Sequence, residues 1–543
     1  MKILLFLSLI ISTSTFSQDT LTKKDIISAS KLLDVKYSEK EIEMMYPDVK
    51  DNIVDYKKMH AIGLNNSVGM SIFQRVSPKS LTKQEKLKWS YDKKIKLPSN
   101  KNDLAFFSIN QLGSLLRNKQ ITSVELTKFF INRLKQFGDS LQCVVSLTEE
   151  IAMEQAKLAD ENFKTNVDKG PLQGIPYGLK DLFAVSGTKT TWGAQPYKDQ
   201  IIDQDAFVYT KLKEAGAVMV AKFTLGALAM GDYWFGGRTK NPWNLERGSS
   251  GSSAGSTSAT VAGLIPFAIG TETHGSIISP SHTCGATGLR PTFGSVSRTG
   301  TMTLSWSLDK VGPICRSSED AATVFAYIHG TDGLDPSATE APFNYTTKKD
   351  IKALRVGYAK NYFDKLDSTS EELQVLKELR SLGIDIKPIN FPDSEVYKFD
   401  MIGMVIGAES AAAFDEFTRT DLDDQMTKQT RYDWPNYFRV SRTIPAVEYI
   451  NTNRHRSILM QKVNQVMENF DVIITPSFAG KQLSITNLTG HPALCMPIGF
   501  TKQGSPNSIT FLANLFKEED LLAFGKYFQD NTKYEDVHPP KFK

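Results

Sequence analysis

The chain has 543 residues, of which 41% are hydrophobic and 23% charged; this composition is ordinary for a globular protein, and the length allows one large domain or two. Its 64 basic residues nearly balance 60 acidic ones, and no basic cluster stands out along the chain. This balance gives no reason to expect a nucleic acid or an anionic membrane as a partner.

The N-terminus has the pattern of a secretory signal. Lys2 is followed by the apolar run ILLFLSLII, which is too short to span a bilayer, and then by the small residues Thr15 and Ser17. We therefore expect a signal peptide over residues 1–17, cut before Gln18, and export to the periplasm or secretion; the alternative is a buried first helix. No later stretch has the pattern of a transmembrane segment.

Residues 18–105 are mixed and polar. Helical patterns occur near Lys23–Leu33 and Glu39–Met45, and three prolines, the first of them Pro47, interrupt the stretch. The pattern predicts an N-terminal helical extension that packs on the main domain, with a lid over the site as the alternative.

From Ser108 onward, apolar residues at helical spacing alternate with short buried runs that are typical of strands. Helices are expected at 123–137, 317–329 and 371–382, and most of 401–470 has a helical pattern. Strands are expected at 217–222, 353–359, 384–391 and 471–476. Alternating helices and short buried strands predict an α/β fold.

Neither the cysteines nor the histidines predict a metal site. The cysteines are widely spaced and lie among apolar or small residues, so buried free thiols are expected at Cys143, Cys284, Cys315 and Cys495. Export would permit a disulfide, but the sequence does not pair them. His282 and His491 are interpreted as packing or capping residues. No phosphate loop or dinucleotide fingerprint occurs, so no cofactor is expected.

The stretch Ser249–Gly300 is the most informative part of the chain. It is crowded with Gly and Ser, yet it carries LIPFAI at its centre, which a flexible linker would lack. The pattern predicts two tight turns that flank a packed apolar segment. Gly lets backbone N–H groups approach a ligand closely, so Gly275-Ser276 would offer a nucleophile beside its own oxyanion donors.

Several motifs, in the right order, resemble the amidase signature family of Ser–Ser–Lys hydrolases. The segments that carry the resemblance are GIPYGLKDLF (174–183), NPWNLERGSSGSS (241–253), SGSSAGS (250–256), GTETHGSIISP (270–280), GLRPTFGSVS (288–297) and NLTGHPALCMPIGF (487–500). The resemblance covers roughly residues 108–528. It implies a single large α/β domain, here 106–543, in which helices cover a mixed, twisted central sheet.

The resemblance also implies a catalytic set: Ser276 as nucleophile, Ser252 as bridging serine and Lys180 as base. Lysine accepts a proton only if burial lowers its pKa from ~10.4, and the apolar flanks of Lys180 are consistent with burial. Ser252 would pass the proton of Ser276 to Lys180 and return it to the leaving amine. Ser253 is the alternative bridge, but the register counted from Arg247 favours Ser252.

Backbone N–H groups of Thr273, His274, Gly275 and Ser276 are expected to form the oxyanion hole. His274 replaces the family's usual Gly and would be strained if the backbone there needed a positive φ. We favour a ring that projects into the pocket and touches substrate over a replacement base.

Other departures from the family pattern surround these residues. Ile278 stands where the family usually has Arg, which removes an ion pair, and Glu272 replaces Asp with the same charge. Ser250 and Ala254 replace two glycines with small residues.

The expected function is hydrolysis of a carboxamide, from a small molecule or a peptide, through an acyl-enzyme on Ser276. One alternative is the glutaminase subunit of a tRNA-dependent amidotransferase, which shares the signature and works with partner subunits in the cytosol; the signal peptide argues against it. Another is a non-catalytic binding protein. The sequence identifies neither the amide nor the oligomeric state, and the pocket walls are expected from Thr191–Gln204 and Met401–Tyr449.

Overall fold

The structure is a computed structural model, and it describes residues 21–33, 35–62, 83–85, 87–393 and 397–543. The expected signal peptide, residues 1–17, lies outside the described residues. Within them, no helix is both long and apolar enough to cross a bilayer.

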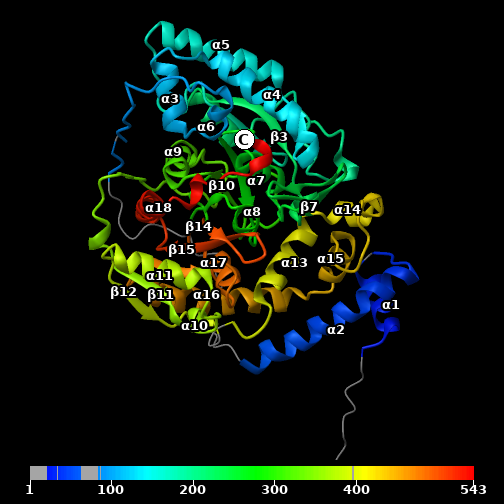
Figure 1. Cartoon of the computed structure of the whole chain (residues 1–543). Helices are drawn as coiled ribbons and strands as arrows, with labels where there is room; N and C mark the ends of the chain where they lie inside the picture. Colours follow the sequence, from blue (N-terminus) through cyan, green and yellow to red (C-terminus); the bar gives the residue numbers. More distant parts are fainter. Residues whose placement is uncertain (1–20, 34, 63–82, 86, 394–396) are drawn as a thin grey trace, which may run out of the picture.

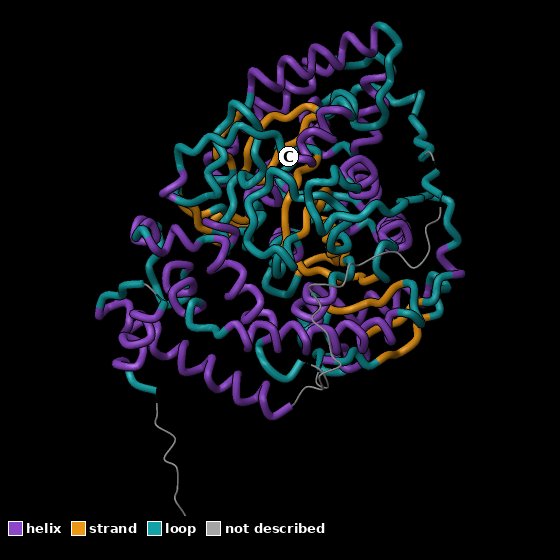
Figure 2. The backbone as a smooth tube through the Cα atoms, turned by 180° about the vertical axis from the view of Figure 1, so that it is seen from behind, coloured by secondary structure: helices purple, strands orange, loops and turns teal. Residues whose placement is uncertain are grey.

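An 11-stranded mixed sheet runs through the molecule, and helices surround it (Figures 1 and 2). In order across the sheet, the strands are β1 (Val144–Leu147), β3 (Val218–Phe223), β2 (Pro176–Lys180), β8 (Phe267–Glu272), β10 (Lys310–Cys315), β9 (Thr287–Arg290), β14 (Ala493–Phe500), β15 (Pro506–Ala513), β13 (Val472–Pro476), β11 (Val356–Ala359) and β12 (Ile386–Ile389). Strand β2 pairs in parallel with β3 and β8, and β11 with β12 and β13; the other pairs are antiparallel. The expected α/β fold with a mixed central sheet is confirmed.

Two small hairpin-like pairs lie outside this sheet. They are β4 (Tyr233–Trp234) with β5 (Gly237–Arg238), and β6 (Lys240–Asn241) with β7 (Asn244–Gly248).

Helices flank both ends and both faces of the sheet (Figure 1). They are α1 (Lys23–Leu32), α2 (Glu39–Ile62), α3 (Ile109–Arg117), α4 (Ser123–Leu141), α5 (Glu149–Lys164), α6 (Phe207–Glu214), α7 (Ala254–Val261), α8 (Ile278–Cys284), α9 (Ser318–Ile328), α10 (Lys360–Phe363), α11 (Glu371–Ser381), α13 (Met401–Ala413), α14 (Asp415–Arg419), α15 (Trp434–Ser441), α16 (Ala446–Met467), α17 (Gln482–Thr489) and α18 (Glu518–Thr532). Helices α5 and α6 pack on β3, whereas α10 and α11 pack on β12 at the opposite end.

The sheet is buried on both faces, as β14 shows. Its side chains alternate between the two faces, as they do in any strand. Leu494 and Met496 belong to the larger apolar core, whereas Ala493 and Cys495 belong to a second core on the opposite face. This double burial explains why the central strands are continuous apolar runs.

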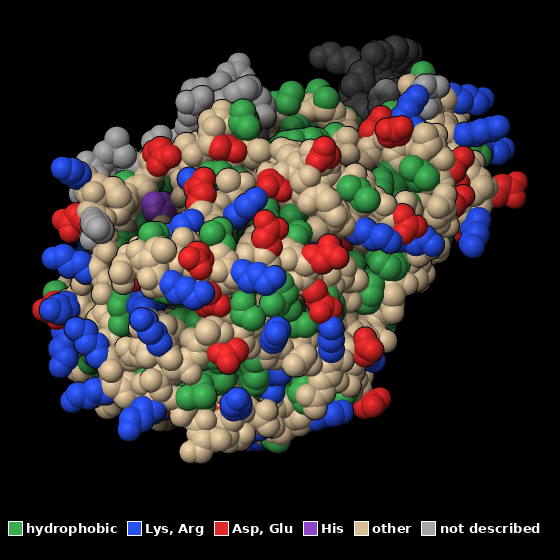
Figure 3. Space-filling view, turned by 90° about the horizontal axis from the view of Figure 1, so that it is seen from above, with side chains coloured by type: hydrophobic (Ala, Val, Ile, Leu, Met, Phe, Trp, Pro, Cys, Tyr) green, Lys and Arg blue, Asp and Glu red, His purple; other side chains and the backbone are tan. Residues whose placement is uncertain are grey.

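Side chains of both charges are interspersed on the face seen in Figure 3. That face therefore has no large patch of a single sign, as the near-neutral balance of the sequence suggested.

Helices α1 and α2 belong to the N-terminal extension, and α2 packs against α15 (Figure 1). The expectation that Pro47 interrupts the helix is wrong, because α2 continues through it to Ile62. Met45 and Val49, on either side of this proline, are both buried in a small apolar cluster that also holds Val440 of α15. Packing on both sides holds the helix together where one backbone hydrogen bond is missing.

A buried ion pair adds to this packing. The Arg439 guanidinium of α15 lies 2.6 Å from Glu41 of α2 and 2.5 Å from Asp423, and the side chains of Arg439 and Asp423 are 3% and 1% exposed. The extension is thus packed on the main domain over these residues. The division of the chain at residues 17 and 105 stays a prediction.

We predict that Arg439→Leu lowers the free energy of unfolding by about 3 kcal/mol, because the buried Asp423 carboxylate loses its cation. Arg442→Leu is the matched control, since its partner Asp415 is 52% exposed and exposed pairs contribute less than about 1 kcal/mol. Urea unfolding followed by tryptophan fluorescence measures both variants. Equal losses would contradict this account of the buried pair.

Candidate active site

Lys180 is the last residue of β2, in the interior of the sheet between β3 and β8. Its side chain is fully buried, and Nζ lies 2.8 Å from Ser252 Oγ and 2.8 Å from Thr271 Oγ1. Burial lowers the pKa of Lys180 to about 7, although the carboxylates of Asp309 and Glu272 raise it. An amine with this pKa is partly uncharged near neutral pH and is able to accept a proton.

Ser252 follows a cis peptide bond from Gly251 and is almost fully buried. Position 251 has to be glycine, because a Cβ there would lie 1.8 Å from the carbonyl oxygen of Gly231. Ser253, the alternative bridge, is occupied elsewhere: its Oγ donates to Thr271 O at 3.1 Å and accepts from Thr271 N at 3.2 Å. Of the two serines, Ser252 is therefore the one whose hydroxyl contacts Lys180.

Ser276 lies on the loop that follows β8, and its side chain is buried. Its carbonyl oxygen accepts a hydrogen bond of 3.1 Å from the backbone N–H of Ser253, which ties this loop to the bridging segment. Within the described residues, the Ser276 hydroxyl makes no hydrogen bond, so the relay is joined in the structure from Ser252 to Lys180 but not from Ser276 to Ser252. Such contacts are often long without substrate and shorten when it binds.

Glu272 accepts hydrogen bonds from the end of the same loop. Oε2 accepts the backbone N–H groups of Ile277 and Ile278 at 2.9 Å each, while Oε1 accepts from Arg290 at 2.9 Å and Asn487 at 2.8 Å. Burial raises the pKa of Glu272, but Arg290 and these donors outweigh it and bring the pKa to about 2. The carboxylate is thus charged, and it fixes the backbone just after the expected nucleophile.

The N–H groups of Thr273, His274, Gly275 and Ser276, expected to form the oxyanion hole, donate no hydrogen bond to any described residue. The positive φ in this loop, +88°, is at Gly275, where a Cβ would lie 2.8 Å from Ser279 Oγ. His274 has no positive φ, so the strain considered for it does not arise.

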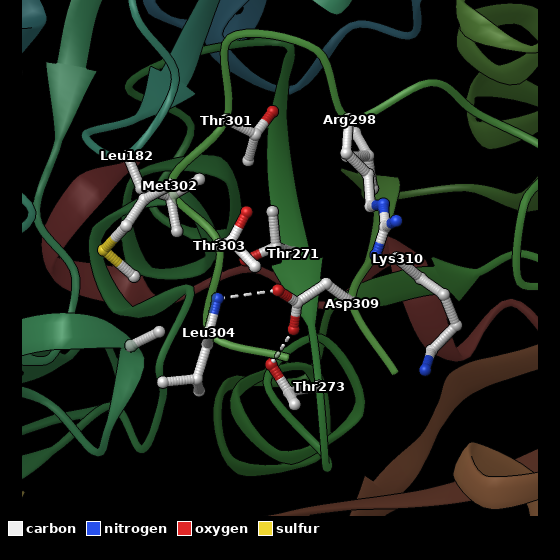
Figure 4. Close-up of a pocket in the computed structure, with 12 residues that line it drawn as sticks. Leu182, Thr271, Thr273, Arg298, Thr301, Met302, Thr303, Leu304, Asp309 and Lys310 are labelled. Carbon is white, nitrogen blue, oxygen red and sulfur yellow. Dashed lines mark hydrogen bonds between the residues drawn. The ribbon is translucent and has the colours of Figure 1, made fainter. Parts of the chain in front are cut away.

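A small cavity lies beside this loop (Figure 4). It has a volume of about 10 Å³, which is room for a single water, and it is lined by Thr271, Thr273, Ala229 and Asp309 among others. Asp309 accepts from Thr273 Oγ1 at 2.6 Å and from the N–H of Leu304 at 2.8 Å. Asp309 thus fixes the start of the loop, as Glu272 fixes its end.

Ile278 is fully buried in the second apolar core, which also contains Leu308 and Met59 of α2. The departure at this position therefore replaces a charged side chain with core packing. Ser250 adopts a left-handed conformation with φ +60°, which is a small strain that a glycine would avoid.

Sequence reasoning missed two residues that surround Lys180. Thr271 is the second residue that contacts Lys180 Nζ. Lys222 of β3 forms a fully buried pair with Asp181, with 2.9 Å between Nζ and Oδ1. Asp181 Oδ2 also accepts from Thr191 N at 2.9 Å, so this pair fixes the chain directly after Lys180. A lysine inside the buried run VMVAKF was the available signal for Lys222.

The two histidines interpreted as packing or capping residues each hydrogen-bond to a neighbouring hydroxyl. His282 contacts Ser508 Oγ at 2.7 Å and His491 contacts Thr489 Oγ1 at 2.8 Å. All four cysteines are described, and each is buried with a free thiol. Among the described residues, one acidic group of three could hold a metal, but the Arg439 guanidinium already pairs with all three carboxylates.

The two segments expected to form pocket walls lie against each other. The Trp192 ring is 6.1 Å from Phe414, and Tyr197 stacks 5.9 Å from Phe417. Trp434 Nε1 donates at 3.0 Å to the carbonyl oxygen of Ala227, in the short turn whose Ala229 lines the cavity. Their contact with a substrate stays a prediction.

Comparisons with known proteins agree on one family. The family model described as Amidase matches residues 125–486. The chain is 31% identical over 485 residues to the A subunit of the glutamyl-tRNA(Gln) amidotransferase from Marinomonas sp. (strain MWYL1), covering 80% of this chain and 99% of that protein. The corresponding protein from Carboxydothermus hydrogenoformans is 29% identical over 484 residues, with 80% and 99% covered. The native peptide amidase from Stenotrophomonas maltophilia superposes with a TM-score of 0.72 at 25% identity, covering 81% of this chain and 100% of that one.

Burial of Lys180 makes the free energy of unfolding depend on pH. Because the pKa of Lys180 falls from its ordinary 10.5 to about 7, the unfolded chain binds one more proton than the folded chain between these values. Stability should therefore rise with pH over that window by about 1.4 kcal/mol per unit from this residue. We predict that Lys180→Met loses this pH dependence. The unfolding free energy of each protein is measured at pH 7.5 and at pH 9, and the change between the two pH values is compared. If the unfolding free energy changes between pH 7.5 and pH 9 by the same amount in Lys180→Met as in the unsubstituted protein, the amine is charged in the folded protein.

Proposed function

Because this chain belongs to the amidase signature family, we propose that it is an exported amidase that hydrolyses the C–N bond of a linear carboxamide. The observation that carries the proposal is the 2.8 Å contact between a buried amine, Lys180, and the Ser252 hydroxyl. A lysine with pKa of about 7 is suited to general-base work near neutral pH. Export rests on residues 1–17, whose pattern alone supports it.

In the proposed reaction, Ser276 Oγ attacks the carbonyl carbon. Its proton passes to Ser252, and the Ser252 proton passes to Lys180 Nζ. The oxyanion accepts hydrogen bonds from the free N–H groups of the 273–276 loop, where one such donor contributes about 3 kcal/mol. The C–N bond then breaks as the leaving nitrogen takes a proton from Ser252, which regains one from Lys180. Water repeats these steps on the acyl ester and releases the carboxylic acid.

The arrangement around the relay supports this assignment. Glu272 and Asp309 are both occupied by donors, so neither is free to serve as the base. The buried Asp181–Lys222 pair and Thr271 hold Lys180 and its surroundings in place. A preorganised set of this kind needs little rearrangement when substrate binds.

A second candidate is the glutaminase subunit of a tRNA-dependent amidotransferase. The observation in its favour is the 31% identity to the A subunit of a glutamyl-tRNA(Gln) amidotransferase. The signal-peptide pattern argues against it, as does His274, which replaces the family's usual Gly in the loop that carries Ser276. Three results together would favour this candidate over the first. The protein would release ammonia from glutamine, it would leave a panel of other carboxamides intact, and it would be found in the cytosol.

Fluorophosphonate capture tests the nucleophile. We predict that the purified protein is labelled once, that Ser276→Ala abolishes labelling, and that Ser252→Ala slows it by at least 100-fold because the relay is cut. Ser253→Ala is the matched control and should keep at least a tenth of the rate, since its hydroxyl contacts Thr271 and not Lys180. Labelling that persists in Ser276→Ala would refute the acyl-enzyme on this residue.

The rate of labelling should also depend on pH. Only uncharged Lys180 accepts a proton, so the rate should rise as pH increases through about 7 and then level off. Stopped assays between pH 5 and pH 9 measure the profile. A rate that is flat over this range would remove the lysine from the role of base.

A further inference from the structure

The side chain of His274 is exposed, although its backbone belongs to the loop that carries Ser276. Its Nε2 lies 3.0 Å from Ser484 Oγ, on α17. The other ring nitrogen, Nδ1, makes no hydrogen bond to any described residue. The contact with Ser484 thus fixes the ring and leaves one nitrogen available two residues before the expected nucleophile.

Charged groups on neighbouring segments act on the His274 ring. Desolvation by the surrounding protein lowers the pKa of His274, while Glu272 and Asp400 raise it and Lys310 and Arg290 lower it. Glu272 is already fully occupied by donors, so of the two carboxylates only Asp400 is open to a ligand.

Asp400 stands at the N-terminus of α13 and is exposed. Its Oδ1 accepts from Tyr397 OH at 3.2 Å and from the N–H of Gly403 at 3.2 Å. Its Oδ2 accepts no hydrogen bond from a described residue. The Tyr397 hydroxyl is also close enough to Ser484 to bond with it, so Tyr397 and Ser484 link Asp400 to His274. The Lys481 ammonium lies 5.7 Å from the Tyr397 ring centre and makes no ion pair with Asp400.

We propose that His274, Ser484 and Asp400 form a polar subsite that binds a hydrogen-bond donor of the substrate, an ammonium group above all, beyond the scissile amide. The free Oδ2 of Asp400 accepts from the ammonium, and the imidazole Nδ1 accepts a second hydrogen bond when Nε2 carries the proton. The inference rests on the proposed function, and it narrows the substrate to carboxamides that carry an amino group.

Two amides of equal length test the subsite. Hexanamide and 5-aminopentanamide differ only in that a terminal methyl is replaced by an ammonium group. Binding is measured by calorimetry on the full chain carrying Ser276→Ala, so that no turnover occurs. We expect the aminoamide to bind at least tenfold more tightly than hexanamide at pH 7.5.

Further substitutions in the same background assign this preference. Asp400→Asn and His274→Gly should each reduce the ratio of the two dissociation constants by at least fivefold, while Asp385→Asn, an exposed carboxylate next to the edge strand β12, should leave it unchanged. Equal binding of the two amides, or a preference that survives both Asp400→Asn and His274→Gly, would overturn the subsite. Failure of the proposed function is distinguished separately, because it appears as absent labelling of Ser276 in the unsubstituted protein.

Discussion

The site depends on keeping one lysine amine dry in the interior of a sheet. Lys180 ends a strand that has parallel neighbours on both sides, so backbone and side chains surround the amine and water is excluded. Burial of this kind disfavours the ammonium form, and this would allow Lys180 to act as the proposed base. The next residue, Asp181, is charged as well, but Lys222 from the neighbouring strand pairs with it inside the same dry region. The interior of the sheet thus holds two lysines in different surroundings: Lys180 contacts hydroxyl groups, whereas Lys222 pairs with a carboxylate.

Carboxylates set the shape of the loop that follows β8. Asp309 binds its first residue, Thr273, and Glu272 binds the N–H groups of Ile277 and Ile278 at its end. With both ends fixed, the N–H groups between them are left without acceptors among the described residues, and Gly275 supplies the one left-handed turn of this loop. Unsatisfied donors in a buried loop are costly, and a bound oxyanion would satisfy them.

Much of this could be predicted from the sequence, for reasons that differ by residue. The strands at 217–222, 353–359 and 471–476 were recognisable because both faces of the sheet are buried, so the strands are continuous apolar runs. The contact of Lys180 with Ser252 followed only from the family motifs, because 72 residues separate the two. The helix through Pro47 and the Asp181–Lys222 pair were missed, since both depend on packing between distant segments that local patterns do not record.

The order of the strands has a consequence for how the chain is assembled during synthesis. Strands β14 and β15 come from the end of the chain, yet they lie between β9 and β13 in the sheet. Before the last two strands emerge, β1, β2, β3, β8, β9 and β10 can pair with one another, and β11 can pair with β12 and β13, but the two groups are joined only through β14 and β15. Asn487, which completes the set of donors to Glu272, arrives with the same late segment. The loop that carries Ser276 therefore reaches its final form only after this late segment has emerged.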